Sequence, residues 1–164
     1  MKQKRRNKVI FLCTGNICRS PMGEALLKDA AAREGGDVLG GLEIVSAGTS
    51  TVDGMPPSAN SVEALKRIGI DISQYRSNFL TQEMVDEAFA IFAMAQSHID
   101  ILRAHYENLP ERVFTAMQMV EGSPKTDIAD PYGGGLDEYL DARDDIALAT
   151  AHILKYLKNE IKKA

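Results

Sequence analysis

The chain has 164 residues, of which 45% are hydrophobic and 26% charged, which is the length and composition of one domain with an ordinary apolar core. Its formal net charge of −4 argues against a general nucleic-acid-binding protein, which would be basic overall. No segment is apolar over the ~18 residues of a membrane span, and the apolar run at 9–13 is too short for a signal peptide, so we expect a cytoplasmic protein with no membrane span.

The chain begins with a basic segment. Residues 1–8 contain five lysines or arginines and no acidic residue. Such a segment can contact an acidic partner or anionic lipid, but its place just before an apolar run favours a solvated leader. We therefore expect a single domain over 1–164 that starts with a basic leader at 1–8.

Apolar runs and helical periodicity alternate along the rest of the chain. They predict, in chain order, a strand at 9–13, a helix at 21–34, a strand at 42–46, helices at 59–68 and 82–87, a strand at 88–94, a helix at 97–107, a strand at 112–116 and a helix at 136–161. Pro21 suits the first position of the first helix, where its missing N–H is not needed. This order is typical of an α/β fold with right-handed βαβ units and a parallel sheet with helices on both faces. Ligands of such sheets bind beyond the carboxyl ends of the strands.

The segment between the first strand and the first helix reads CTGNICRSP, at 13–21. The spacing of Cys13 and Arg19 alone is weak evidence, but the surrounding residues suit a phosphate-binding loop. Backbone N–H groups of a loop at a helix N-terminus converge on an anion, and the planar fork of Arg19 can hold two phosphate oxygens. We expect Gly15 to provide the positive φ that such a loop needs, with Asn16 the next most tolerant residue.

Cys13 lies at the start of this loop, and the field that binds a phosphate also favours its thiolate form. The Ser20 hydroxyl can donate a further hydrogen bond to the sulfur. These residues predict a cysteine nucleophile and a phosphocysteine intermediate. The alternative is a buried structural cysteine beside an arginine that pairs at the surface.

The nonapeptide resembles the signature loop of the low-molecular-weight protein tyrosine phosphatases. The resemblance extends over nearly the whole chain, through SAGT at 46–49, GIDIS at 69–73 and an Asp-Pro pair at 130–131. It implies a four-stranded parallel sheet, no metal or other cofactor, a phosphorylated protein or peptide as substrate and an enzyme that we expect to be a monomer. It also implies that Cys13 and Arg19 share the phosphate-binding loop with six further residues: Thr14, Gly15, Asn16, Ile17, Cys18 and Ser20.

The reaction needs a general acid for the leaving oxygen and then a base for the attacking water. Pro131 biases Asp130 toward an extended conformation, and both lie in a glycine-rich segment before the last helix. Asp137 and Glu138 are better explained as first-turn residues that complement the helix dipole. An Asp-Pro pair alone is usually a turn, but the resemblance favours Asp130 as the acid.

Cys18 has two interpretations. It can capture an oxidised Cys13 as a disulfide, as the resemblance implies, or it can simply pack beneath the loop. The loop also resembles that of thiol-dependent arsenate reductases. Those enzymes relay electrons through further cysteines, and no cysteine follows Cys18, so the relay cannot run within this chain. A non-catalytic phosphate-binding module is a further alternative, but it would lack a nucleophile or an acid. The three histidines lie at 98, 105 and 152, without the spacing of a metal site.

The resemblance also bears on the substrate. A bulky aliphatic residue at the position of Ile17 accompanies phosphotyrosine, and Tyr132 can form one wall for a phenyl ring. The glycines after Tyr132 instead resemble the protein-arginine phosphatases, where the position of Ile17 is threonine. Tyr75 stands where many bacterial members have histidine, which puts the support of the loop in question. We expect phosphotyrosine, with phosphoarginine as the alternative.

Overall fold

The computed structural model describes residues 5–163. Four parallel strands form one sheet in the order β2-β1-β3-β4. Their bounds are Lys8–Cys13 for β1, Glu43–Gly48 for β2, Ala88–Ala93 for β3 and Arg112–Thr115 for β4. The α/β fold expected from the sequence is confirmed.

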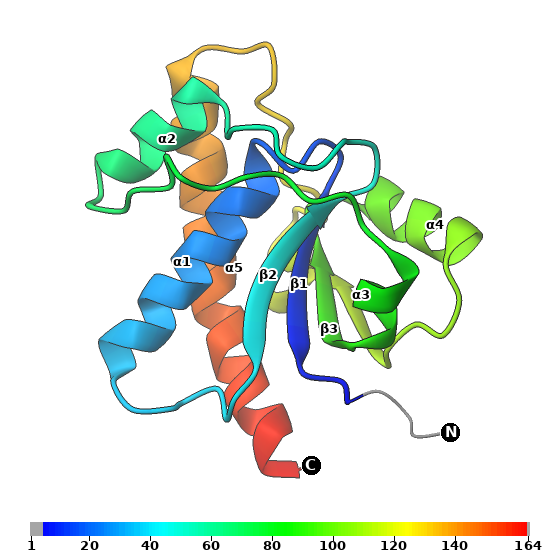
Figure 1. Cartoon of the computed structure of the whole chain (residues 1–164). Helices are drawn as coiled ribbons and strands as arrows, with labels where there is room; N and C mark the ends of the chain where they lie inside the picture. The colour runs from blue at the N-terminus through cyan, green and yellow to red at the C-terminus, as the bar shows by residue number, and fades with distance from the viewer. Residues whose placement is uncertain (1–4, 164) are drawn as a thin grey trace.

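Helices cover both faces of the sheet (Figure 1). The helices are α1 (Arg19–Glu34), α2 (Ala59–Lys66), α3 (Gln82–Asp86), α4 (Gln96–His105) and α5 (Leu136–Lys163), with a 3₁₀ turn, η1, at Ala116–Met119. Side chains of a strand alternate between faces. In β1, Val9 and Phe11 therefore pack toward α1 and α5, while Ile10 and Leu12 pack toward α3 and α4. Burial on both faces explains why the two central strands, β1 and β3, are almost wholly apolar.

The structure corrects several predicted boundaries. Helix α1 begins at Arg19, so Pro21 is its third residue and not its first. Proline is still tolerated there, because the first N–H groups of a helix have no intrahelical partner. The 3₁₀ turn η1 was not predicted. Thr115 ends β4 and caps this turn, because its hydroxyl oxygen accepts a hydrogen bond from the Gln118 N–H at 3.3 Å.

The basic leader is shorter than expected. Lys2 and Lys4 lie outside the described residues, but Lys8 is the first residue of β1. Arg6 donates hydrogen bonds to the carbonyl oxygens of Val85, Ala88 and Asn108, at 2.7–3.0 Å, which fasten it to the fold. Within residues 5–163, no helix is long and apolar enough to cross a membrane.

Candidate active site

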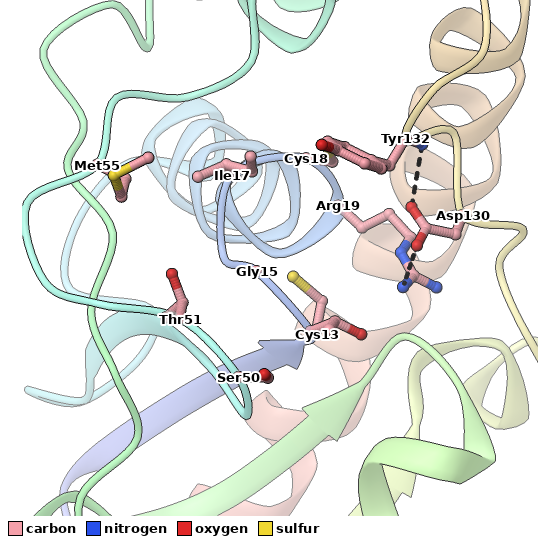
Figure 2. A pocket seen from close by; sticks show the side chains of 11 residues that line it. Cys13, Gly15, Ile17, Cys18, Arg19, Ser50, Thr51, Met55, Asp130 and Tyr132 are labelled. Carbon is pink, nitrogen blue, oxygen red and sulfur yellow. Dashed lines mark hydrogen bonds and ion pairs between the residues drawn. The ribbon is translucent and has the colours of Figure 1, made fainter.

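A cavity of about 290 Å³ opens at the carboxyl end of β1, where α1 begins. Figure 2 shows the side chains that line it. Seven lining residues were predicted from the sequence as catalytic or phosphate-loop residues, and Tyr132 was predicted as a wall. The lining residues are Cys13, Thr14, Gly15, Ile17, Cys18, Arg19, Ser50, Thr51, Met55, Asp130 and Tyr132. Two predicted residues, Asn16 and Ser20, are fully buried and are not among them.

The first two carbonyl groups of the loop at 13–19 are held by the segment after β2. The Thr49 N–H donates to the carbonyl oxygen of Cys13 at 2.9 Å, and the Ser50 N–H donates to that of Thr14 at 3.0 Å. Gly48 is needed for this approach, because a Cβ there would lie 2.6 Å from the Thr14 carbonyl oxygen. The SAGT segment therefore fixes the start of the loop through its backbone.

Two later carbonyl groups are held by the start of α2. The Ser58 N–H donates to the carbonyl oxygen of Ile17 at 2.9 Å, and the Ser61 hydroxyl donates to that of Cys18 at 3.1 Å. In a trans peptide the C=O and N–H groups point in opposite directions. Carbonyl groups held on the outside of the loop therefore leave the following N–H groups directed inward, as an anion site requires.

Asn16, and not Gly15, has the positive φ of the loop, at 56°. The expectation for Gly15 was wrong, because four hydrogen bonds hold the side chain of Asn16 in place. Its Nδ2 donates to Ser20 Oγ at 2.7 Å and to Ser46 Oγ at 3.1 Å. Its Oδ1 accepts from the Tyr75 hydroxyl at 2.6 Å and from the Asn78 N–H at 2.8 Å.

Tyr75 therefore supports the loop directly, which resolves the question raised by its place in the sequence. Its hydroxyl also contacts Ser46 Oγ, which donates to Glu24 at 3.0 Å. Burial raises the pKa of Tyr75 to about 12, so the hydroxyl keeps its hydrogen at neutral pH. The hydrogen bond from Tyr75 to Asn16 thus joins two neutral groups and is present throughout the neutral pH range.

Two donors converge on the sulfur of Cys13. Ser20 Oγ lies 2.8 Å from Cys13 Sγ, and the Asn16 backbone N–H donates to the sulfur at 3.3 Å. Because Asn16 Nδ2 can only donate, Ser20 Oγ accepts from it and keeps its own hydrogen for the sulfur. Donation from both groups stabilises a thiolate, which is the nucleophilic form of cysteine.

Arg19 is 5% exposed and lies between the loop and the segment at 127–135. Its Nη1 donates to the carbonyl oxygen of Ile128 at 2.8 Å, and its Nη2 lies 3.5 Å from Asp130 Oδ2. The Asp130 side chain is 52% exposed and accepts the Tyr132 N–H at 3.1 Å. Figure 2 shows both contacts of the Asp130 carboxylate, one with the Arg19 guanidinium and one with the Tyr132 backbone N–H. The structure thus brings together the three residues predicted to be catalytic.

Cys18 differs from Cys13 although both are free and buried. Its sulfur lies 3.6 Å from the Ser58 hydroxyl and 3.5 Å from the Tyr139 hydroxyl. Burial raises the pKa of the Cys18 thiol. Cys18 is therefore held as a neutral thiol within the loop and is less suited than Cys13 to attack phosphorus.

Sequence reasoning missed His98, which was weighed only as a metal ligand. It is 2% exposed, and its Nε2 lies 2.9 Å from the Thr14 hydroxyl in the phosphate loop. Burial, with help from the positive charge of Arg19, lowers the pKa of His98 to about 4, so the ring is neutral at pH 7. The signal available in the sequence was the position of His98 shortly after the third strand, near the strand ends where the site was expected. Within residues 5–163, no three His, Cys, Asp or Glu side chains are grouped as metal ligands would be.

The walls of the cavity are partly apolar. Tyr132 is 72% exposed and Met55 is 45% exposed, and Figure 2 shows them on opposite sides, with Ile17 between. Ile17 and Tyr132 were predicted from the sequence, whereas Met55, Ser50 and Thr51 were not. A flat apolar group can enter between these walls while an anion occupies the loop.

Comparisons with known proteins agree with this geometry. Residues 8–163 match the family model described as low molecular weight phosphotyrosine protein phosphatase. A protein-arginine-phosphatase of Bacillus subtilis (strain 168) is 36% identical over 152 residues, which cover 93% of this chain and 97% of the relative. A probable low molecular weight protein-tyrosine-phosphatase of Ralstonia solanacearum, EpsP, is 34% identical over 134 residues, or 82% and 84% of the two chains. A solved structure of the YwlE arginine phosphatase, a mutant with a phosphorylated active site serine, has a TM-score of 0.84 at 35% identity and covers 93% of this chain and 97% of that chain.

Proposed function

Since the chain belongs to the low molecular weight phosphotyrosine protein phosphatase family, we propose that it hydrolyses phosphorylated protein side chains through a phosphocysteine intermediate on Cys13. One observation carries the proposal. The Cys13 sulfur, with two hydrogen-bond donors directed at it, lines the same cavity as the guanidinium of Arg19. The nucleophile therefore lies in the same cavity as the groups that can bind an anion, which suits attack on the phosphorus of a bound phosphoryl group.

The first half of the reaction transfers the phosphoryl group to the enzyme. Arg19 and the inward N–H groups of the loop bind the phosphoryl oxygens. The thiolate of Cys13 attacks phosphorus, so that an S–P bond forms and the bond to the leaving group breaks. The leaving oxygen keeps the bonding electron pair and receives a proton from Asp130, so the leaving group departs as a neutral alcohol or phenol.

The second half regenerates the enzyme. Asp130, now a carboxylate, takes a proton from a water molecule, whose oxygen attacks phosphorus. The S–P bond breaks, inorganic phosphate leaves and Cys13 is again a thiolate. Asp130 can serve both steps because it is exposed to water and yet held near Arg19 at 3.5 Å.

Phosphotyrosine is the proposed substrate. Ile17 presents an aliphatic wall and Tyr132 an exposed aromatic ring, and both line the cavity (Figure 2). A phenyl ring between an aliphatic and an aromatic wall buries apolar surface on both faces. Phosphoarginine is the second candidate, because the Bacillus subtilis relative is a protein-arginine-phosphatase and the same fold accommodates that substrate. Its guanidinium would approach the carboxylate of Asp130.

The test compares two peptides of identical flanking sequence, one with phosphotyrosine and one with phosphoarginine, without added metal. Wild type, Ile17→Thr and Ile17→Val are assayed by kcat/KM for phosphate release. Threonine and valine have the same shape, so valine is the control for lost volume. We expect wild type to prefer phosphotyrosine, and Ile17→Thr to lose about tenfold on it relative to Ile17→Val, because a hydroxyl disfavours an apolar contact.

The outcomes separate the claims. A wild-type preference for phosphoarginine would overturn the substrate and leave the mechanism in place. Release of phosphate from neither peptide would reject the proposed function itself.

Cys18 is proposed to protect the nucleophile from oxidation. Hydrogen peroxide converts the Cys13 thiolate to a sulfenic acid, and the Cys18 thiol then attacks that sulfur, giving a disulfide and water. Mass spectrometry after peroxide treatment tests this step. The Cys18→Ser variant should accumulate sulfinic acid at Cys13, and recovery of activity by a dithiol in that variant as fully as in wild type would contradict the role.

The enzyme is further proposed to act as a cytoplasmic monomer, since one chain supplies all residues of the cavity. A solution mass near 17.9 kDa by light scattering is the expected result, and a stable dimer would contradict it.

A further inference from the structure

Thr14 and His98 form a hydrogen-bonded pair at the cavity that the proposed mechanism does not use. Thr14 lines the cavity directly after Cys13, while His98 lies beneath it on α4 and is 2% exposed. Thr14 Oγ1 and His98 Nε2 are 2.9 Å apart. The direction of this hydrogen bond decides what the threonine hydroxyl can do.

The other ring nitrogen settles the direction. The backbone N–H of Ala95 donates to His98 Nδ1 at 3.1 Å. A backbone N–H can only donate, so Nδ1 carries no hydrogen, and the neutral ring carries its hydrogen on Nε2. His98 therefore donates to Thr14 Oγ1. The hydrogen of the Thr14 hydroxyl remains available, because no partner within residues 5–163 accepts it.

We propose that Thr14 is a substrate-binding residue whose hydroxyl donates a hydrogen bond to an oxygen of the bound phosphoryl group, and that His98 is the positioning residue that orients this hydroxyl. The proposal rests on the proposed phosphatase function. Thr14 lines the same cavity as Cys13 and Arg19, so an anion bound there lies close to this residue. A hydroxyl whose oxygen already accepts a hydrogen bond is a better donor, because the two bonds polarise each other.

The electrostatic surroundings keep His98 in the required form. Burial and Arg19 disfavour the charged ring, while the carboxylates of Asp130 and Asp127 favour it, and the balance lowers the pKa to about 4. A protonated ring would place an N–H against the N–H of Ala95. The neutral ring with its hydrogen on Nε2 is thus the form present near pH 7.

His98 also has a structural role, which the test must separate from positioning. It is the third residue of α4, and by accepting the Ala95 N–H it satisfies a donor at the helix start. Glutamine at 98 can accept that N–H through Oε1 and donate to Thr14 through Nε2. Glutamate can accept the same N–H but cannot donate, and it would draw the Thr14 hydroxyl hydrogen toward itself. His98→Gln and His98→Glu therefore form a pair of nearly equal size that differs in the donor and in the charge.

The experiment measures kcat/KM for an aryl phosphate and the inhibition constant of inorganic phosphate at pH 7. The variants are Thr14→Ser, Thr14→Val, His98→Gln and His98→Glu. Thr14→Val should weaken phosphate inhibition and lower kcat/KM by roughly 10- to 100-fold, the effect of one hydrogen bond to a charged group. His98→Glu should lose activity by at least a similar factor. Thr14→Ser and His98→Gln keep the donors, so each should lose clearly less activity than Thr14→Val and His98→Glu, respectively.

Several results would overturn the proposal. Wild-type phosphate inhibition in Thr14→Val would show that the hydroxyl makes no contact with the anion, and this result decides the matter even if the His98 variants do not fold. Equal activity of His98→Gln and His98→Glu would leave His98 only its structural role. Failure of wild type to hydrolyse the aryl phosphate would reject the proposed function, whereas hydrolysis by wild type and Thr14→Val alike would reject this inference alone.

Discussion

In the loop at 13–19, four carbonyl groups and the side chains of Asn16 and Arg19 are bound to other parts of the fold, whereas the loop at 127–135 exposes the side chains of Asp130 and Tyr132. The two loops face the same cavity. The end of the site that we propose binds phosphate is therefore a preformed backbone structure, and the end proposed to meet the leaving group consists of exposed side chains. Binding of the anion requires little rearrangement, while recognition of the leaving group can change by single substitutions.

The largest effect is expected at the fixed end. Cys13→Ser removes the nucleophile, because a serine hydroxyl is not ionised in the field that supports a thiolate. Phosphate release from an aryl phosphate should fall by at least about 10⁴-fold. Inorganic phosphate should still bind, with a dissociation constant within about threefold of wild type by calorimetry. Turnover near the wild-type rate would refute the phosphocysteine route.

The next effect is expected at the exposed end. Asp130→Asn keeps the size of the side chain but cannot give or take a proton, so kcat should fall by about 10²- to 10³-fold. The loss should be larger for a phenol of high pKa than for a nitrophenol, which leaves without a proton. Asp137→Asn, in the first turn of α5, is the control and should keep wild-type kcat. An equal loss for both leaving groups would contradict the assignment of Asp130 as the acid.

A third effect concerns His98, beneath the fixed loop. The pKa of this ring is about 4 in the fold against 6.5 for the ordinary group. Between these values the unfolded chain binds a proton that the native protein does not, so the free energy of unfolding falls as pH falls from 6.5 to 4. The fall attributable to His98 amounts to roughly 3 kcal/mol. Urea unfolding of wild type and His98→Gln across this range should show a smaller slope in the variant, and parallel curves would refute the assignment.

The smallest effect tests how firmly the fixed loop is held. Tyr75→Phe removes one of the two donors to Asn16 Oδ1, which should cost about 1 kcal/mol of stability and lower kcat/KM a few-fold. Tyr106→Phe is the matched control, since its hydroxyl donates to the Leu80 carbonyl oxygen at 2.8 Å and is not among the residues of the cavity. It should cost similar stability and leave kcat/KM unchanged. Equal activity losses in the two variants would deny Tyr75 a special role at the loop.

Local features of the chain could be predicted from the sequence. The strand at β1, the start of α2 and the cysteine–arginine loop depend on neighbouring residues, and all three lie where the pattern indicated. The start of α1 was missed by two residues, because the loop and the helix share Arg19. The first residue of such a helix depends on which backbone N–H groups face the anion site, and the pattern of apolar residues carries no information about these groups.

Features that depend on distant partners could not be predicted. The sequence favoured Gly15 for the positive φ, since glycine adopts it without steric cost. Asn16 adopts it instead, because Ser46, Tyr75 and Asn78 supply hydrogen bonds that exist only in the folded chain. His98 was missed for the same reason, as its contact with Thr14 joins positions that are far apart in the sequence.

The partners that hold the phosphate loop come from almost the whole length of the chain. Asn16 is 30 positions from Ser46, Thr14 is 84 from His98, and Cys18 is 121 from Tyr139. Contacts of such separation form only when the strands and helices have assembled, since each closes a long loop. A nascent or partly folded chain therefore carries the complete nonapeptide without its anion site. The environment of the Cys13 sulfur is thus a property of the assembled topology, and the nonapeptide alone does not provide it.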